Sequence, residues 1–376
     1  QAEDGIRDVE RSRGLGDVYK RQGYGSGVDT RKRWEFMRKA GVTGAVGRGE
    51  GEELAPAMVL CDLPTQHGFD PDAPEARGRV GGAGFSLSTK EDFRSLFDGV
   101  PLDKVQVTII SMNSTMATMA IYLAYAQDRG YSPENLNVRG SNLLYSCCMF
   151  DFLTFPPQYT LRLMTEYIYY FVKHMPRCEH TSLQGHNIVE VGATGVQEVS
   201  LILQLAIELT EECVKVGLDP DEVVPGFYHG IASYMDFFEQ IAKIRSLRRL
   251  WAKTAKERLK CKKTESLKCR FRSQSSGSMY TAQEPYNNIV RGTITTLASV
   301  LGGAENVYTT PFDEAICVTT EESQRLAIRT QQIIYHETNI PTSVVDPLAG
   351  SYYVEWLTNR FEEEVTKYLA NMEERG

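Results

Sequence analysis

The chain has 376 residues, of which 42% are hydrophobic and 24% charged, a balance that excludes a disordered or fibrous protein. A formal net charge of −8 at pH 7 argues against a general nucleic-acid binder, because such proteins present a basic surface. No apolar run reaches the ~18–20 residues needed to cross a bilayer, and the eight cysteines form no CxxC pair, which favours reduced thiols and a cytoplasmic protein.

Residues 1–29 show no apolar periodicity, and we interpret them as an N-terminal extension that is non-native or disordered. From Thr30 to Gly376, short apolar runs alternate with long amphipathic stretches. The predicted strands are Met58–Leu63, Val105–Ser111, Leu136–Ser141, Thr181–His186, Val223–His229, Cys269–Gln274, Val307–Phe312 and Thr342–Pro347. The predicted helices are Thr115–Arg129, Tyr159–His174, Val196–Val216, Ala232–Lys260, Ile289–Leu301, Glu321–Glu337 and Tyr353–Glu374. Strands that alternate with helices predict parallel βαβ units, and eight such units predict one α/β domain over residues 30–376, a (β/α)8 TIM barrel.

The predicted strands carry small polar residues where such a barrel normally packs Val, Ile and Leu. They are Thr108, Ser111, Thr181, Ser182, Gln184, Ser273, Gln274, Ser275, Thr309 and Thr310. Burying each without a hydrogen bond would cost ~1–3 kcal/mol. We therefore favour a barrel with a hollow axis lined by these side chains. The alternative is that they lie at strand ends and face loops.

Three segments at strand ends carry candidate site residues. In Arg272-Ser-Gln-Ser-Ser-Gly277, an amide and hydroxyls precede a glycine that lets a flat ligand approach, although an ordinary turn explains the segment equally well. Asp313 and Glu314 can accept hydrogen bonds from a ligand or form an acidic pair at a helix start. His186 is a candidate general acid or a structural histidine. The six histidines are scattered and predict no metal site.

Eleven collinear motifs together resemble one family. They are FDGVPLDKV, SMN, FPP, KHMP, GxxxxEVGA from Gly185, EQIAKIRSLRRLWA, QSSG, QEPYNNIVR, FDEA, RTQQII and DPLAGSYYVE. This string, from Thr30 to Gly376, is similar to the large (alpha) chain of the methylmalonyl-CoA mutase family, the adenosylcobalamin-dependent acyl-CoA mutases. The resemblance implies a barrel whose axis accepts the pantetheine arm of an acyl-CoA. It also implies that adenosylcobalamin caps the carboxyl-terminal mouth and supplies the radical for a carbon-skeleton isomerisation.

The resemblance assigns site residues one by one. Gln274 and Gly277 match residues near cofactor and substrate, Glu314 matches the glutamate at the adenosyl ribose, and Glu190 matches one beside the corrin. Leu63 and Asn113 match positions at the mouth, and Gln66 stands where the family has a corrin-side histidine.

The chain also departs from the family at catalytic and substrate-binding positions. Asn187 aligns with the catalytic histidine, and His186 lies one residue earlier. Phe150 replaces the arginine that pairs with the substrate carboxylate, and we group Ser141, beside Gly140 at a family glutamine position, with the substrate-binding residues. Val224 and Gly226 replace residues that contact CoA. An unpaired buried carboxylate is penalised, so we expect a less charged, bulkier or aromatic acyl group than methylmalonyl.

The DxHxxG signature of the cobalamin-binding domain does not occur in the sequence. We therefore expect a separate cobalamin-binding small subunit or a missing C-terminal domain, in a dimer or heterotetramer, and neither nucleic acid nor membrane as a partner. The alternative function is a non-catalytic structural paralogue that pairs with an active mutase chain. A barrel lyase or aldolase is less favoured, because the strand ends offer no Schiff-base lysine or metal site.

Overall fold

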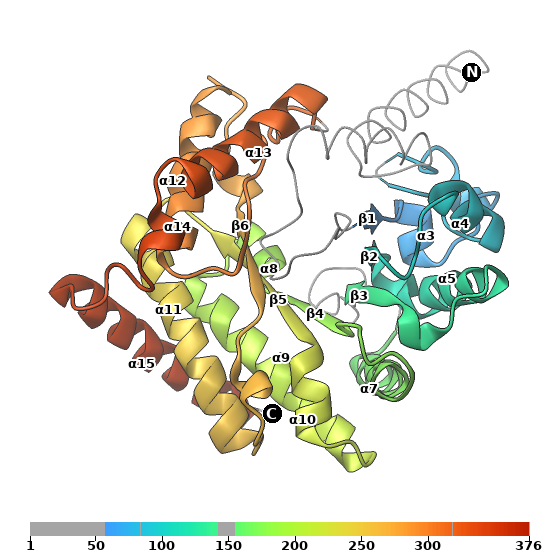
Figure 1. Ribbon diagram of the computed structural model, residues 1–376, viewed down its shortest axis with the longest axis horizontal. Coiled ribbons are helices and arrows are strands. Elements are labelled where there is room, and N and C mark those ends of the chain that lie inside the picture. Colours follow the sequence, from blue (N-terminus) through green and yellow to red (C-terminus); the bar gives the residue numbers. More distant parts are fainter. Residues whose placement is uncertain (1–56, 83, 142–154, 318, 376) are drawn as a thin grey trace. The chain divides into compact units, whose positions relative to one another are not determined.

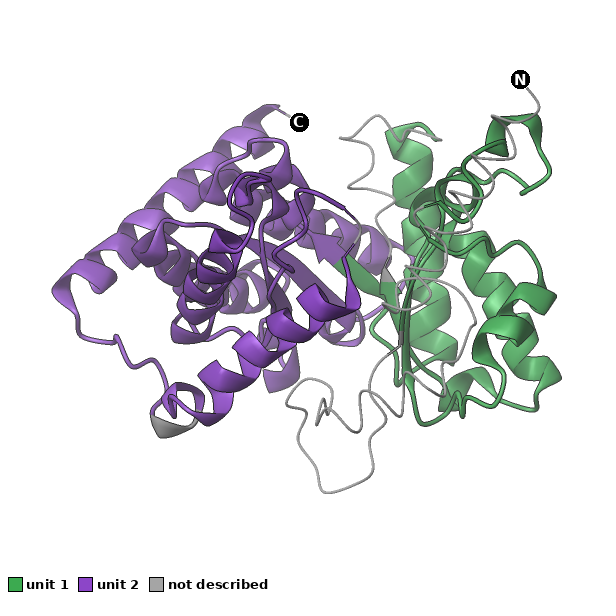
Figure 2. Cartoon of the chain, turned by 90° about the horizontal axis from the view of Figure 1, so that it is seen from above, with its two compact units in different colours: residues 1–182 green, residues 183–376 purple. Residues whose placement is uncertain are grey.

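The computed structural model describes residues 57–82, 84–141, 155–317 and 319–375, and the chain forms two compact units, residues 1–182 and 183–376 (Figures 1 and 2). The predicted extension 1–29 and the predicted substrate residue Phe150 lie outside the described residues. The boundary between the two units falls within one strand, Thr181–Gln184.

The first unit contains a parallel sheet in the order β1-β2-β3. Its strands are β1 (Ala57–Leu60), β2 (Gln106–Ile110) and β3 (Asn137–Ser141). Its helices are α3 (Leu63–His67), α4 (Lys90–Phe97), α5 (Thr115–Asp128) and α7 (Pro157–His174). α4 begins at a capping box formed by Thr89 and Asp92 and contributes Phe93 and Phe97 to a buried aromatic cluster with Tyr122 of α5. This core fixes the strands whose ends carry the predicted mouth residues.

The second unit is built on a four-stranded sheet in the order β4-β5-β6-β7. Its strands are β4 (Thr181–Gln184), β5 (Phe227–Ser233), β6 (Phe271–Ser275) and β7 (Asn306–Tyr308). Its helices are α8 (His186–Glu190), α9 (Gly195–Lys215), α10 (Pro220–Val223), α11 (Phe237–Lys253), α12 (Asn287–Leu301), α13 (Glu321–His336), α14 (Ile340–Ser343) and α15 (Tyr352–Arg375). The β5–β6 and β6–β7 pairings are parallel, so the carboxyl ends of these strands meet at one edge.

The α/β prediction is confirmed, but the eighth predicted strand is wrong. Thr342–Pro347 contains the end of α14 followed by a loop. Asn339 takes a left-handed backbone conformation just before α14, and Pro341 lies in its first turn, where the fixed proline φ suits a helix start. Among the described residues the strands form two sheets of three and four strands, and no closed barrel is formed.

Hydroxyl groups on β6 and directly after β7 face α12, not a hollow axis. The Ser273 hydroxyl lies 2.8 Å from that of Ser299, and the Ser275 hydroxyl lies 2.9 Å from that of Thr295. The hydroxyls of Thr309 and Thr296 form a third pair of this kind. The prediction that Ser273, Ser275 and Thr309 line a hollow axis is therefore wrong, because their hydrogen bonds to α12 remove the cost of burial. Successive strand residues point to opposite faces, so Arg272 and Gln274 occupy the other face of β6.

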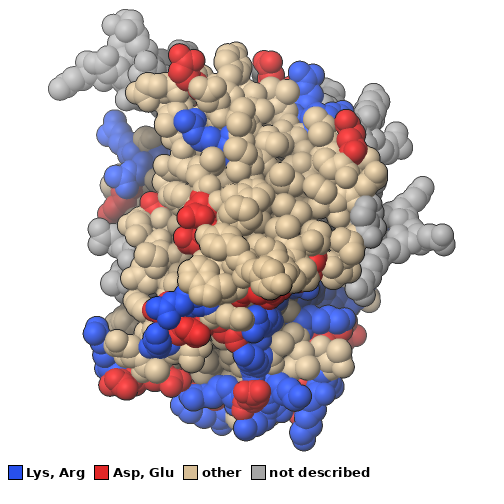
Figure 3. All heavy atoms as spheres, turned by 90° about the vertical axis from the view of Figure 1, so that its left-hand side faces the viewer, with Lys and Arg blue, Asp and Glu red and all other residues tan. Residues whose placement is uncertain are grey.

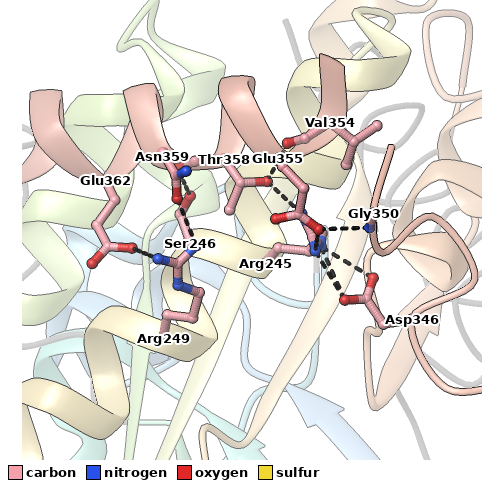
Figure 4. A network of polar contacts seen from close by, with 10 residues as sticks. All are labelled: Arg245, Ser246, Arg249, Asp346, Gly350, Val354, Glu355, Thr358, Asn359 and Glu362. Atoms are coloured by element: carbon pink, nitrogen blue, oxygen red, sulfur yellow. Dashed lines mark hydrogen bonds and ion pairs between the residues drawn. The ribbon is translucent and has the colours of Figure 1, made fainter. Parts of the chain in front are cut away.

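A polar network joins α11 to α15 through the buried Arg245 (Figure 4). The guanidinium binds both carboxylate oxygens of Asp346 at 3.0 Å, Glu355 at 2.7 Å and the Thr358 hydroxyl at 2.8 Å. Glu355 also accepts a hydrogen bond from the Gly350 amide. The network therefore fixes the loop before α15 as well as the helix itself.

We expect Arg245→Met to lower the free energy of unfolding by about 2–3 kcal/mol, because it leaves two carboxylates without their partner. The value is below that for a fully buried pair, since the Asp346 and Glu355 side chains keep 31% and 37% of their exposure. Urea unfolding followed by tryptophan fluorescence measures the change. Arg249→Met is the matched control: this side chain is 45% exposed, so its loss should cost less than ~1 kcal/mol. Equal losses for the two variants would contradict the network's role.

Charge is distributed unevenly over the face shown in Figure 3, where Lys, Arg, Asp and Glu crowd the lower part and are sparse in the upper part.

Three aromatic side chains of the second unit are exposed: Phe238 is 43%, Tyr353 53% and Trp356 59% exposed. The Phe238 and Tyr353 rings lie 5.5 Å apart, and those of Tyr353 and Trp356 6.0 Å apart. An exposed aromatic cluster of this kind is typical of protein interaction surfaces.

Candidate active site

The candidate site is organised by Glu190 at the end of α8, the short helix that follows β4. Its carboxylate accepts hydrogen bonds from the Ser276 hydroxyl at 2.7 Å and from the Gly277 and Ser278 amides at 2.8 Å each. These three donors belong to the loop that follows β6. Glu190 therefore ties together the carboxyl ends of two strands that are not neighbours in the sheet.

Gly277 brings a second carboxylate to the same place. A Cβ atom built on Gly277 would lie 3.5 Å from a carboxylate oxygen of Glu314 and 3.9 Å from one of Glu190. Both oxygens are thus within 4 Å of one point beside the glycine backbone. Because Gly277 has no side chain, its backbone can approach these two carboxylates closely.

The surroundings shift the pKa values of the two carboxyl groups in opposite directions. Burial alone would raise the pKa of Glu190, but the hydrogen bonds from Ser276, Ser278 and Gly277 together outweigh it and hold the pKa below its usual range. At Glu314, burial by surrounding protein and then the charges of Glu190 and Asp313 raise the pKa. A pair of acids with pKa values pushed apart is typical of sites that bind or catalyse.

The Glu190 hydrogen bonds predict an acid-sensitive loop. Because the donors favour the charged carboxylate, their stabilisation is fully present above the ordinary glutamate pKa and is lost as the pH falls through the lowered pKa of Glu190. We expect hydrogen exchange to find the Gly277 and Ser278 amides protected at pH 6, with protection factors that fall on acidification. In Glu190→Gln, these two amides should be weakly protected both at pH 6 and after acidification. A strong pH-independent protection in this variant would contradict the interpretation.

His186 and Asn187 both lie in α8, which places His186 one turn before Glu190. Burial, followed by the positive charge of Arg272, lowers the pKa of His186 to about 3, although Glu190 acts in the opposite direction. Nδ1 of His186 is buried and has no hydrogen-bond partner among the residues described. The imidazole is therefore neutral near pH 7. Asn187 is partly exposed beside it.

Gln274 shares a face of β6 with Arg272. The Arg272 guanidinium donates a hydrogen bond to the Gln274 amide oxygen at 3.0 Å and lies over the Tyr308 ring, 5.7 Å from its centroid. Gln274 and Tyr308 are register partners of β6 and β7. The second unit therefore brings together the predicted residues His186, Asn187, Glu190, Gln274, Gly277 and Glu314 on α8, β6 and the loops after β6 and β7.

The first unit holds the remaining predicted mouth residues. Leu63 and Gln66 lie on α3, which packs against the short 3-10 helix η2 (Met112–Ser114) that carries Asn113. Gln66 is buried, and its side chain donates a hydrogen bond to the Cys61 carbonyl at 2.6 Å.

Ser141 ends β3, but its side chain is outside the described part of the structure. Ser141 and the other predicted substrate residue, Phe150, therefore remain predictions.

In the described ranges no cluster of three or more His, Cys, Asp or Glu residues is arranged to hold a metal ion. The helices described there also include none long and apolar enough to traverse a bilayer.

The sequence placed Arg272 and Ser276 in a candidate segment without an individual role for either, and it did not single out Ser278. The period of two along β6 could have found Arg272, because Arg272 and Gln274 are two residues apart. The serines carried no such signal, since their function here depends on backbone amides that only folding brings to Glu190.

Comparison with known proteins identifies the family. Residues 51–376 match the methylmalonyl-CoA mutase family. The 2-hydroxyisobutanoyl-CoA mutase large subunit of Aquincola tertiaricarbonis is 33% identical over 356 residues, which cover 94% of this chain and 61% of that protein. The mitochondrial methylmalonyl-CoA mutase of Bos taurus is 36% identical over 321 residues, 85% of this chain and 42% of that protein.

A third relative, the methylmalonyl-CoA mutase of Escherichia coli (strain K12), is 35% identical over 322 residues, 85% of this chain and 44% of that protein. The chain thus spans about 42–61% of the length of these three relatives. The match nevertheless extends over most of the chain, and its relatives are named as mutases, a class of isomerase. The chain belongs to the methylmalonyl-CoA mutase family.

Proposed function

We propose that this chain is the catalytic domain of an adenosylcobalamin-dependent acyl-CoA mutase, an isomerase that rearranges the carbon skeleton of an acyl-CoA other than methylmalonyl-CoA. The observation that carries the proposal is the pair of carboxylates, Glu190 and Glu314, which meet beside Gly277 at the carboxyl ends of parallel strands. Active sites of parallel α/β folds lie at this edge. Family membership supplies the reaction class.

A (β/α)8 barrel over residues 30–376 is part of this proposal. Both sheets keep the strands in chain order, and the pairings β1–β2, β2–β3, β5–β6 and β6–β7 are parallel, which supports it. Within the first unit, an isolated parallel bridge also pairs Arg139 of β3 with Glu179, two residues before β4. The lumen-facing residues of β6 in this barrel would be Arg272 and Gln274.

The residues around Gly277 fit the hydrogen-bonding groups of adenosylcobalamin. Carboxylates accept hydrogen bonds from ribose hydroxyls and from amide groups, and oxygens of Glu190 and Glu314 both lie within 4 Å of one point beside Gly277. We assign cofactor contacts to Glu190, Gly277 and Glu314, and to Leu63, Gln66 and Asn113 of the first unit. When bound, the cofactor supplies the radical chemistry.

The chain's own residues would bind and orient the thioester. Asn187, at the family's histidine position, can donate a hydrogen bond to the thioester carbonyl but cannot transfer a proton. Neutral His186 can donate or accept a hydrogen bond, and Gln274 presents its amide beside them. Ser141 and Phe150 complete the proposed substrate-binding set.

The proposed enzyme requires a cobalamin-binding domain, as a small subunit or as a further domain, and we propose a dimer or heterotetramer. The test combines the chain with adenosylcobalamin, a cobalamin-domain protein and a panel of acyl-CoAs. We expect turnover of one acyl-CoA together with a radical signal in electron paramagnetic resonance. The absence of both with every acyl-CoA would count against the proposal.

A non-catalytic paralogue is the second candidate, and the side chains at the histidine position favour it. Neither Asn187 nor a histidine with a pKa of about 3 can protonate a substrate near pH 7. Such a paralogue would co-purify with an active mutase chain and would leave its turnover unchanged when its own Glu190 is replaced.

A further inference from the structure

Arg272 is a positive charge in the candidate site without an anionic partner. Its Nε is buried and makes no hydrogen bond, and among the residues that the structure describes no carboxylate forms an ion pair with it. Within the described part of the chain, the guanidinium donates one hydrogen bond, and it goes to a neutral amide, that of Gln274. A cation withdrawn from water is costly unless an opposite charge compensates it. The Arg272 side chain is partly exposed and has no carboxylate paired with it in the described structure, so the anion of a ligand can pair with it.

The neighbours of Arg272 do not supply that anion. Tyr308 offers its ring face, which attracts a cation but leaves the guanidinium donors unused. Glu190 is the acid that, with Arg272, acts on His186, but its carboxylate already accepts three hydrogen bonds from the loop after β6. The Glu190 carboxylate is thus hydrogen-bonded to that loop and forms no ion pair with Arg272 in the described structure.

The guanidinium leans toward the carboxyl end of β6, where the candidate site lies. It reaches Gln274, two residues further along the strand, and its charge acts on His186, which follows β4. Both neighbours belong to the set proposed to hold the acyl thioester. The planar fork of an arginine binds a carboxylate through two parallel hydrogen bonds.

We propose that Arg272 is a specificity-determining residue that binds a carboxylate on the acyl group of the substrate. This inference rests on the proposed binding of an acyl-CoA. It departs from the sequence expectation of a less charged acyl group, because β6 provides a positive charge that the family comparison at Phe150 did not reveal. The carboxylate would approach from β6, which favours an acyl group of a different shape from methylmalonyl.

Binding of acyl-CoAs to the full chain tests the inference without turnover or cofactor. Isothermal titration calorimetry would compare succinyl-CoA, whose acyl chain ends in a carboxylate, with butyryl-CoA, which ends in a methyl group, and with CoA alone. We expect succinyl-CoA to bind about 10-fold more tightly than butyryl-CoA. Arg272→Gln should weaken succinyl-CoA binding about 10–100-fold and butyryl-CoA binding less than about 3-fold, because a charge-assisted pair is lost.

Two further variants make the test specific. Arg272→Lys keeps the charge and should retain part of the preference for succinyl-CoA. Arg291→Gln is the matched control, since Arg291 is also partly buried but bonds Asn288 and Thr281, and it should leave all three affinities unchanged. Circular dichroism verifies that each variant is folded.

The possible failures are distinguishable. Equal affinities for succinyl-CoA and butyryl-CoA, or an equal loss for all three compounds in Arg272→Gln, would overturn the role of Arg272. No measurable binding of any of the three to the wild-type chain would instead count against the proposed acyl-CoA function.

Discussion

Replacing Lys243 with methionine should lower the free energy of unfolding by about 3–5 kcal/mol, the cost of breaking a buried ion pair. Lys243 of α11 donates to Glu198 of α9 at 2.8 Å and to the Ala232 carbonyl of β5 at 2.7 Å, while Glu198 accepts the Ala232 amide at 2.6 Å. The side chains of Lys243 and Glu198 are 2% and 0% exposed. The variant would leave the Glu198 carboxylate in the core with no opposite charge.

Urea unfolding followed by tryptophan fluorescence measures this loss, because Trp251 and Trp356, two of the three tryptophans, belong to the second unit. Lys253→Met is the control: its side chain is 54% exposed, so its pair with Glu362 should contribute less than ~1 kcal/mol. The double variant Lys243→Met, Glu198→Gln should lose less than Lys243→Met alone, since a neutral amide can still accept the Ala232 amide hydrogen. If Lys243→Met lowered the free energy of unfolding no more than Lys253→Met does, the prediction would be refuted.

Replacing Gly277 with leucine should abolish the proposed mutase turnover, by at least about 100-fold, while the free energy of unfolding changes by less than ~1 kcal/mol. The backbone of Gly277 is not left-handed, so a side chain is compatible with its conformation. A leucine, however, would extend into the position shared by Glu190 and Glu314 and exclude the ligand from it.

Gly277→Ala is the matched variant, because its single methyl group would make ordinary van der Waals contact with Glu314 at 3.5 Å. We expect it to retain turnover within about 10-fold, which corresponds to ~1.4 kcal/mol of barrier. Steady-state assays with the acyl-CoA identified by the panel provide the measurement. If Gly277→Leu were as active as Gly277→Ala, the ligand would not occupy the space beside Gly277.

Much of the fold follows from local sequence patterns. The long helices α5, α7, α9, α12, α13 and α15 begin and end within two residues of their predicted limits, because their apolar residues recur with helical spacing. The predicted strand before α11 begins four residues before β5 does, because Val224-Pro225-Gly226 forms a 3-10 turn and β5 begins at Phe227. The β-branched Val223 and Val224 have the composition of a strand but do not belong to one.

For the candidate site, the family resemblance assigned separate roles to Glu190, Gly277 and Glu314, and the structure places these three residues close together. The sequence could not distinguish the two faces of β6, because Ser273 and Ser275 are as polar as Gln274. Only the packing of α12, whose Thr295 and Ser299 pair with the serines, decided that these hydroxyls are structural.

The amino-acid sequence by itself determined the family, the α/β class and the residue types of the site, because motif order and hydrophobic spacing are properties of the chain. Only the tertiary structure decided how the pKa values of the site's carboxyl groups shift and which charged side chains pair with one another. The pKa of Glu190 depends on amides from a loop 87 and 88 residues further along the chain, and the missing partner of Arg272 is visible only once its surroundings are assembled. Both are consequences of burial and of charges brought within a few ångströms, which no local pattern encodes.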